Sequence, residues 1–333
     1  MEDIISISHG NGGKKTSKLI EELIIPEFNN EALNQLGDGA LLKLSGDIAF
    51  STDSFVIDPY FFPGGDIGKL SVCGTVNDLL MCGSVPKYLS LALILEEGFK
   101  IEELKTIVKS IAETASKAGV KVVTGDTKVV DKGHGHGIYI NTAGIGEKIA
   151  GIELGKHRIK SGDKIIVSGN VGDHGVSILC ARERLLDSNI ISDCTPLNEA
   201  VNALLQFKES VKILRDPTRG GVATTLNEFV ENSNLSIELD ENSIPIHKTV
   251  KTACDLLGLD PLYSANEGKV LAIVDAEIAD RAVEELRKTE AGKNAAIIGE
   301  VIDSIASKVL LKSGLAGRRV LDKLSHDILP RIC

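Results

Sequence analysis

The chain of 333 residues contains no tryptophan, few other aromatic residues and no excess of basic charge. Eight phenylalanines and four tyrosines make up 4% of the chain, which leaves few rings on which single-stranded nucleic acid could stack. Lys and Arg number 37 against 47 Asp and Glu, so the formal net charge is −10. Because nucleic acids and anionic membranes attract clustered Lys and Arg, this balance argues against both as partners.

The sequence also lacks long apolar runs, an evident secretory signal and paired cysteines. The longest apolar run, residues 88–95, has the length of a strand and is far shorter than the ~20 residues of a membrane span. The first residues are acidic and show no signal-peptide pattern. The six cysteines form no CxxC pair and no zinc-ligand spacing. We therefore expect reduced, mostly buried thiols in a cytoplasmic protein.

Apolar residues (43%) and glycine (33 residues) are abundant, and helix and strand signals alternate along the chain. In the first half we predict strands at 47–55, 87–95, 120–124 and 138–144, and helices at 67–81 and 101–118. In the second half we predict strands at 164–168, 269–274 and 295–301, and helices at 176–186, 196–207, 222–232, 246–257 and 279–289. A polar, basic stretch at 155–162 separates them. The pattern predicts two α/β (α+β) domains, 1–150 and 151–320, and a tail, 321–333.

A glycine-rich segment with two lysines, HGNGGKK at residues 9–15, precedes an expected helix. Backbone N–H groups of such a segment can surround a polyphosphate, which makes Asn11, Gly12 and Gly13 candidates for nucleotide binding. The spacing is not that of a P-loop. An ordinary N-terminal turn explains the same residues about as well.

Acidic residues recur in short segments flanked by Gly, Ser, Thr or Asn, where we expect strand ends or helix starts: Asp38, Asp53, Asp78 and Asp126. One Asp beside a glycine is ordinary turn chemistry, but four such residues within the first 126 indicate carboxylates that converge. Mg²⁺ prefers oxygen ligands and bridges nucleotide phosphates. The pattern predicts Mg²⁺ on Asp53, Asp78 and Asp126, with Asn77 and Gly125 beside them as further nucleotide-binding candidates.

Three features of the remaining sequence leave alternatives open. Glycine-rich segments at 168–175 and 216–221 precede expected helices and suit either anion binding or helix capping. Glu267, in the segment ANEGK, is either part of a surface turn or an acid/base group at a cleft. His134 and His136 could serve as a base or as metal ligands, although a plain loop between strands is the simpler interpretation.

The chain ends in the segment PRIC, with Cys333 as its last residue. Thirteen extended tail residues span up to about 40 Å. A thiol on such a tail could visit both a distant cleft and another protein. A frayed end with an accidental cysteine is the alternative.

Taken together, these segments resemble the HypE family of hydrogenase-maturation carbamoyl dehydratases. That family lies within the superfamily of aminoimidazole ribonucleotide synthetase, selenophosphate synthetase and thiamine-monophosphate kinase. The resemblance covers essentially the whole chain and rests on HGNGG, GTVNDLL, VVTGDTKVV, SGNVGDHG, DPTRGGV, ANEGK and PRIC. It implies a two-domain PurM-like fold, a homodimer in which the first domains close into a β-barrel, and ATP in a cleft between the domains near that interface. Superfamily members often carry a second Asp where this chain has Gly39, which weakens the metal role of Asp38.

The resemblance also implies a reaction. A HypF-type carbamoyltransferase loads a carbamoyl group onto Cys333. The enzyme then uses ATP to dehydrate that group to a thiocyanate, and a HypC/HypD-type iron-carrying complex accepts the cyanide destined for nickel–iron hydrogenase. Glu267 would remove the amide protons, and Lys128 would stabilise phosphate charge or hold Glu267 in place.

Two alternatives remain at this point. One is another ATP enzyme of the superfamily, such as selenophosphate synthetase, which has an early reactive cysteine where this chain has none before Cys73. The other is a non-catalytic module that binds ATP and docks a partner through its tail.

Overall fold

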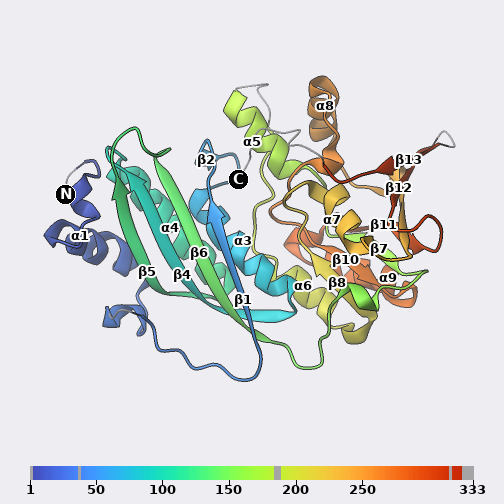
Figure 1. Ribbon diagram of the computed structural model, residues 1–333, viewed down its shortest axis with the longest axis horizontal. Helices are drawn as coiled ribbons and strands as arrows, with labels where there is room; N and C mark the ends of the chain where they lie inside the picture. Colours follow the sequence, from blue (N-terminus) through green and yellow to red (C-terminus); the bar gives the residue numbers. More distant parts are fainter. Residues whose placement is uncertain (1–2, 37–38, 184–188, 315–316, 325–333) are drawn as a thin grey trace.

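The computed structural model describes residues 3–36, 39–183, 189–314 and 317–324, which form two domains side by side (Figure 1). The first domain contains a four-stranded sheet in the order β1-β6-β4-β5. Only the β4–β5 pair is parallel. The strands are β1 (Ile48–Phe55), β6 (Ile138–Lys148), β4 (Ser84–Glu96) and β5 (Lys121–Val130). A short hairpin of β2 (Phe61–Phe62) and β3 (Gly65–Asp66) precedes the first long helix.

Two long helices cover one face of this sheet, and both have the bounds that the sequence predicts: α3 (Ile67–Met81) and α4 (Ile101–Ala118). The Asp66 carboxylate caps α3 by accepting the N–H groups of Gly68 and Lys69. At the other helix, α4 ends at Gly119, whose φ of 69° is the left-handed conformation that favours glycine. Since α3 lies between the sheet and the second domain, it is buried on nearly all sides.

The opposite face of the sheet is largely uncovered in the chain, and the strand register shows which residues lie on it. In β1 the exposed and half-buried residues alternate, with Phe50 65% exposed and Asp53 half-buried. Phe50 pairs with Ile145 on one face, and Asp53 pairs with Thr142 on the other. The Thr142 hydroxyl lies 2.6 Å from that of Thr75 on α3, which identifies the Asp53 side as the helix-covered face.

Short N-terminal helices lie beyond the β5 edge: α1 (Lys14–Leu19), the π-helix η2 (Ile20–Ile24) and α2 (Ile25–Phe28). They contact β5 and α4 rather than the second domain. The domain therefore ends in an apolar layer along β5.

The second domain contains a seven-stranded sheet in the order β13-β12-β9-β11-β7-β10-β8, in which only β12 and β9 are parallel. The strands are β13 (Arg318–Leu321), β12 (Val309–Lys312), β9 (Ser236–Asp240), β11 (Ala296–Ile302), β7 (Lys164–Val167), β10 (Leu271–Val274) and β8 (Val211–Arg215). The helices are α5 (Asp173–Glu183), α6 (Asn198–Leu205), α7 (Gly221–Val230), α8 (Lys248–Leu257) and α9 (Ala279–Arg287).

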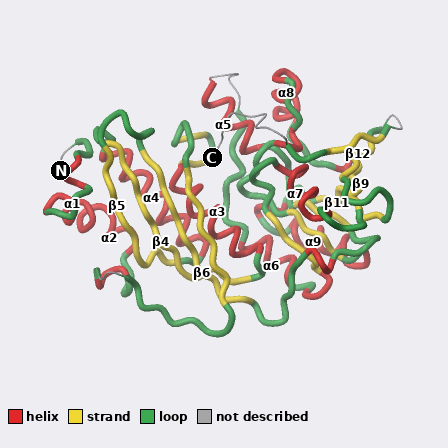
Figure 2. Tube along the Cα trace, in the orientation of Figure 1, coloured by secondary structure: helices red, strands yellow, loops and turns green. Residues whose placement is uncertain are grey.

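Helices pack against both faces of this second sheet (Figure 2). Strand β10 is accordingly buried at every position, with Ala272 in the core that contains α6 and α9 and Leu271 in the core that contains α7. The short strands β8, β9, β12 and β13 were not predicted. Among the described helices, none combines the length and apolar composition needed to cross a membrane.

Candidate active site

A cavity of about 250 Å³ lies where the two domains meet, and five acidic side chains line it, one of which is Glu228 of α7. Asp53 comes from β1 and Asp78 from α3, while Asp216 and Glu267 come from loops of the second domain. Arg215 and Arg219 line the same space. The cavity therefore draws its polar groups from both domains.

Asp53 and Asp78 lie close enough for the charge of Asp78 to affect the ionisation of Asp53. The Ser51 hydroxyl donates to Oδ2 of Asp78 at 2.6 Å, which fixes that carboxylate toward β1. Burial and the neighbouring Asp78 charge raise the pKa of Asp53 to about 6, against the opposing pull of Arg219 at 3.8 Å. A bound cation would relieve this repulsion.

Asp216 is a third carboxyl of the cluster, and sequence reasoning missed its role. It follows β8 and is 7% exposed. Burial and the Asp78 charge raise its pKa to about 7. We predicted only anion binding or capping for this segment, although an Asp set between Arg215 and Pro217 was a visible signal.

Asp126 does not join this cluster within one chain. It lies inside β5, not at a strand end as predicted, and Asp53 likewise lies inside β1. Strands β1 and β5 are the opposite edges of the sheet. Asp126 pairs with Ala92 and so points to the open face, opposite to Asp53. Across the described residues, no three Asp, Glu, His or Cys side chains are arranged to hold a metal ion.

A second cavity, of about 270 Å³, lies between the N-terminal helices and β5. Gly12, Gly125, Asp126 and Lys128 line it together with apolar residues of the N-terminal helices and β4: Ile20, Ile24, Phe28, Leu91 and Leu93. The Lys128 ammonium pairs with Asp126 at 3.1 Å, and both side chains are exposed. Position 125 requires glycine, because an added Cβ would lie 2.4 Å from the Leu91 carbonyl oxygen.

The predicted glycine-rich segment lies beside this second cavity. The Gly13 N–H donates to the Asn11 side-chain oxygen at 3.1 Å, and the Gly12 N–H donates to the Thr16 hydroxyl at 3.0 Å. Asn11 and Gly13 are exposed. Asp38 falls outside the described residues, so its prediction is not addressed.

Glu267 is 5% exposed and lines the interdomain cavity, as expected of an acid/base group at a cleft. Lys128 lines the other cavity, so one chain does not bring the predicted pair together. His134 and His136 line neither cavity. The His136 Nδ1 lies 2.7 Å from the Tyr139 hydroxyl in the β5–β6 loop, which agrees with the plain-loop interpretation.

Asn77 has a different role from the predicted nucleotide contact. It is 1% exposed, and its side-chain amide donates to the carbonyl oxygens of Thr195 and Glu267 at 3.2 and 3.4 Å. Its Oδ1 accepts the Leu197 N–H at 2.9 Å. Both ends of the amide are therefore engaged by second-domain backbone.

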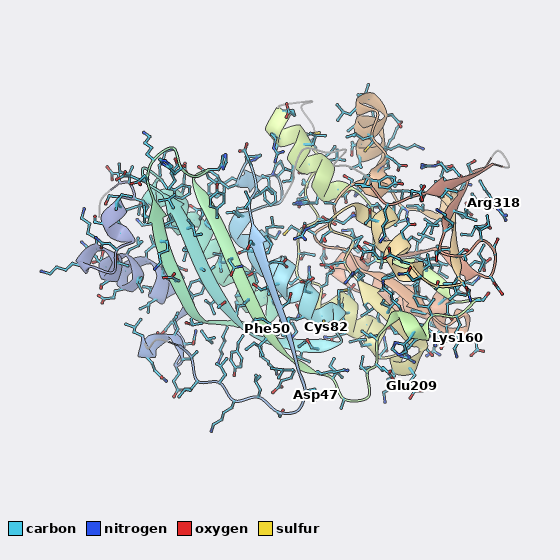
Figure 3. All side chains as sticks on the ribbon, viewed as in Figure 1. Asp47, Phe50, Cys82, Lys160, Glu209 and Arg318 are labelled. Carbon is cyan, nitrogen blue, oxygen red and sulfur yellow. The ribbon has the colours of Figure 1, made fainter. Side chains whose placement is uncertain are left out.

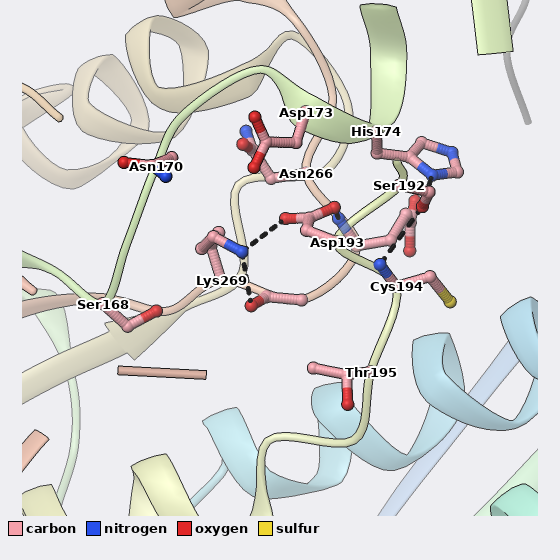
Figure 4. A network of polar contacts seen from close by, with 12 residues as sticks. Ser168, Asn170, Asp173, His174, Ser192, Asp193, Cys194, Thr195, Asn266 and Lys269 are labelled. Carbon is pink, nitrogen blue, oxygen red and sulfur yellow. Dashed lines mark hydrogen bonds and ion pairs between the residues drawn. The ribbon is translucent and has the colours of Figure 1, made fainter. Parts of the chain in front are cut away.

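A buried polar network surrounds the segment that carries Glu267 (Figure 4). The Lys269 ammonium pairs with Oδ2 of Asp193 at 3.1 Å, and both side chains are almost fully buried. The Asn266 Oδ1 accepts the Gly172 N–H at 2.7 Å. Burial lowers the pKa of His174 to about 4, so this residue is neutral at pH 7, with Nδ1 2.8 Å from the Ser192 hydroxyl.

Five cysteines lie in the described part of the chain, and four of them are buried as predicted. Cys82, at the end of α3, is the exposed one (Figure 3). Cys333 lies outside the described residues.

Comparison with family models divides the chain as the fold does. The N-terminal domain of AIR synthase related proteins matches residues 36–148, and their C-terminal domain matches residues 160–312. The chain is 47% identical to carbamoyl dehydratase HypE of Azotobacter vinelandii, covering 99% of this chain and 97% of that protein. It is 46% identical to carbamoyl dehydratase HypE of Escherichia coli K12, covering 99% of both chains.

Solved structures give the same assignment. A crystal structure of hydrogenase maturation protein HypE in complex with ATP superposes with a TM-score of 0.94 at 44% identity, covering 98% of this chain and 99% of that chain. HypE from a HypE–HypF complex gives a TM-score of 0.81 at 48% identity, covering 92% and 99%. Thiamine-monophosphate kinase of Stenotrophomonas maltophilia, at 20% identity and a TM-score of 0.69, shares the fold. The chain therefore belongs to the AIR synthase related proteins and, among them, to the carbamoyl dehydratases of the HypE family.

Proposed function

We propose that this chain is an ATP-dependent carbamoyl dehydratase, which converts a carbamoyl group on Cys333 into a thiocyanate and so supplies the cyanide ligand of nickel–iron hydrogenase. The relatives carry this activity in their names, and one was solved with ATP. The observation in this chain that carries the proposal is the interdomain cavity, where a buried Glu267 faces the same space as Asp53, Asp78 and Asp216. A base and a phosphate-handling carboxylate cluster are what the reaction requires.

The residues suit a magnesium nucleotide. Carboxylate oxygens are the ligands that Mg²⁺ prefers, and burial together with the neighbouring Asp78 charge raises the pKa of Asp53, so a bound cation would stabilise its charged form. When bound, Mg²⁺ would neutralise charge on the transferring phosphate. The apolar second cavity suits the nucleotide base, with Gly12, Gly125 and Asp126 at the polar part of its lining.

A homodimer would place the residues of the interdomain cavity near those of the partner subunit's second cavity. Strands β1 and β5 are free edges among the described strands, and the open face between them exposes Phe50 and Ile94. A barrel in which β1 of one subunit borders β5 of its partner would bring the edge strand that carries Asp53 next to the strand that carries the partner's Asp126 and the partner's Lys128.

Subunit mixing tests this arrangement. Asp126→Ala and Glu267→Gln homodimers should each be inactive. An equal mixture of the two variants should regain about a quarter of the parent rate, because random mixing makes half of all dimers heterodimers, and each heterodimer has one intact site of two. No recovery on mixing would show that each site lies within one chain.

The chemistry of the protein's own groups follows from this placement. The carbamoyl oxygen attacks the γ-phosphorus and ADP leaves, which makes that oxygen part of a good leaving group. Glu267 then takes up one proton from the amide nitrogen, the carbon–oxygen bond breaks, the departing phosphate carries away the second proton and the nitrile remains. Lys128 stabilises the phosphate charge that develops.

The last described residues contact the segment that leads to Glu267. The Tyr263 hydroxyl donates to the Asp322 carbonyl oxygen at 2.8 Å, and Tyr263 precedes Glu267 by four residues. Nine residues, 325–333, follow the described part and span up to about 30 Å when extended. That reach suits loading of Cys333 by a HypF-type carbamoyltransferase outside the cleft, dehydration within it, and delivery to a HypC/HypD-type complex in the cytoplasm.

The dependence of ATP turnover on loading tests the proposed activity. The chain with carbamoylated Cys333 should release one ADP and one phosphate per thiocyanate formed, and the unloaded chain should hydrolyse ATP far more slowly. Equal turnover in both states would make the chain an uncoupled ATPase and would overturn the proposal. A selenophosphate synthetase is disfavoured, because the earliest thiol, Cys73, is fully buried.

A further inference from the structure

We propose that Asn77 and Asp193 are positioning residues that clamp the peptide of Glu267 and tie the general base to Asp78 across the domain boundary. The inference rests on the proposed function in one respect, since it takes Glu267 as the base. It adds two residues to which no contact with substrate is assigned.

Asn77 supplies the clamp from the first domain. It lies on α3 directly before Asp78, and all three of its hydrogen bonds go to second-domain backbone, at Thr195, Leu197 and Glu267. The bond to the Glu267 carbonyl oxygen is 3.4 Å long. Because neighbouring residues on a helix keep a fixed separation, this amide sets the position of Glu267 relative to the Asp78 carboxylate.

Asp193 supplies the clamp from the second domain. Its Oδ1 accepts the Glu267 N–H at 3.0 Å, while Oδ2 pairs with the Lys269 ammonium at 3.1 Å. The Asp193 side chain is only 2% exposed. A buried ion pair is a weak source of stability, since desolvation offsets most of the attraction, so its geometric effect on Glu267 is the more informative property.

The backbone segments that carry Asp193 and Glu267 pack directly against each other. A Cβ on Gly268 would lie 1.8 Å from the Asp193 carbonyl oxygen, so only glycine permits this approach. The N–H and C=O of Glu267 are thus each held by a buried side chain, one from each domain. Since misplacing a reacting group by about 1 Å can cost 10²-fold in rate, the clamp should affect proton removal more than binding.

The test measures single-turnover thiocyanate formation, ATP affinity and carbamoyl loading in the full-length dimer. Asn77→Ala should slow thiocyanate formation at least tenfold, with ATP affinity and loading within about twofold of the parent. Asp193→Asn keeps an acceptor for the Glu267 N–H and should stay within about threefold. Where Asn77→Ala does not fold, Asn77→Ser applies, because its shorter side chain cannot span to the Glu267 carbonyl.

A matched control separates clamping from general domain contact. Asn198 also donates an interdomain hydrogen bond, to the Ala118 carbonyl at 3.1 Å, and this bond does not involve Glu267 or Asn77. Asn198→Ala should leave the rate within twofold. Equal slowing in Asn198→Ala and Asn77→Ala would overturn the proposal.

A double variant distinguishes this inference from the function beneath it. In the Glu267→Gln background, Asn77→Ala should cause no further loss, because the clamp acts through the Glu267 carboxylate. A further tenfold loss would show a structural role and contradict the clamp. Parent-rate thiocyanate formation by Glu267→Gln itself would instead refute the base assignment.

Discussion

Carboxylates that share one cavity determine the electrostatics of this protein at the scale of single residues. Asp53, Asp78 and Asp216 come from three different elements, and the mutual repulsion of these groups adds to the cost of burial. A group of this kind is a poor stabiliser of the empty fold and a good receptor for a cation carrying phosphates. Its protonation should therefore be visible in stability as well as in binding.

The pH dependence of stability follows from the raised pKa values. Well below pH 3.8 Asp216 is protonated in both the folded and unfolded states, and its neutral form is compatible with burial. As the pH rises, the unfolded chain ionises near the ordinary value of 3.8 while the folded chain holds its proton to about 7, so stability is lost progressively across this window. Asp216→Asn should thus raise the melting temperature by several degrees at pH 8 and leave it nearly unchanged near pH 4. Calorimetry showing the same shift at both pH values would contradict the assigned charge state.

The nucleotide carboxylates are tested by single substitutions. Asp78→Ala and Asp126→Ala should each abolish ATP turnover in the carbamoylated protein and leave the fold intact, because each removes one oxygen ligand and neither side chain lies in an apolar core. Isothermal titration with Mg²⁺ and ATP checks binding, and circular dichroism checks the fold. Parent-level hydrolysis by both variants would make the acidic cluster structural.

The proposed roles of Glu267 and Lys128 predict variants that complete the early steps of the reaction and fail at a later one. Glu267→Gln should still accept carbamoyl at Cys333 and bind ATP, since neither step needs a base, but should stop before the nitrile. Lys128→Ala should show the same arrest or lose phosphoryl transfer too. His134→Ala is the paired control, and loss of cyanide in that variant with normal cyanide in Glu267→Gln would transfer the base role to the histidine loop.

At the scale of elements, the four-stranded sheet separates the site residues by its register. Rows of paired residues alternate between the helix-covered and the open face, so Asp53 and Asp126 point to opposite sides. The open face carries exposed apolar side chains on edge and central strands, Phe50 and Ile94 among them. Such a face is typical of one that a second copy covers.

Dimerisation through this face can be tested by one charge. The parent should sediment as a dimer at micromolar concentration, and Phe50→Asp should sediment as a monomer, because a carboxylate would be buried without a partner. Leu256 on α8 is 68% exposed and lies far from the sheet in sequence and domain, so Leu256→Asp should remain dimeric. A monomeric parent would defeat the prediction.

Local sequence predicted some elements well and others only in part. The bounds of α3 and α4 followed from apolar spacing and, for α4, from Gly119. Strand β5 was predicted to end at residue 124, because Gly125 and Asp126 resemble a turn, yet it runs from Lys121 to Val130. Here the packing of Gly125 under Leu91 overrides the local preference.

The chemical character of the site residues was predictable from the sequence, but their division between two cavities was not. The convergence of Asp53 and Asp78 was expected from their sequence context, whereas for Glu267, which is buried, the sequence alone leaves a surface turn and an acid/base group at a cleft as alternatives. Strand order and the face of each residue depend on tertiary pairing, which is why the separation of Asp126 from that group was not foreseen. Asn77 was assigned to the nucleotide because nothing local indicates that its amide meets the second domain.

At the scale of the whole molecule, the proposed reaction requires two domains, two subunits and one tail. Helix α3 contacts both the first sheet and second-domain elements α6 and β8, so the interdomain cavity is formed by packed elements. The reacting thiol is the only proposed site group that belongs to neither domain. Its position at the end of the chain should matter as much as its chemistry.

Changes at the terminus test that position. Deleting Cys333 should leave dimerisation and ATP binding unchanged and remove carbamoyl loading completely.

Adding a few residues after Cys333 should block dehydration more than loading, since a cleft admits only a small end group. ATP should slow alkylation of Cys333, measured in a Cys82→Ser background because Cys82 is also exposed. An extended chain that makes thiocyanate at the parent rate would refute the narrow cleft.

The mass of the C-terminal peptide tests the central claim most directly. After loading by a carbamoyltransferase and addition of Mg²⁺ and ATP, the peptide that contains Cys333 should first gain one carbamoyl group and then lose the mass of one water, with the change confined to Cys333. The loss should require ATP and should be absent in Glu267→Gln. A carbamoylated Cys333 that persists unchanged with Mg²⁺ and ATP, or a water loss that proceeds without ATP, would contradict the account.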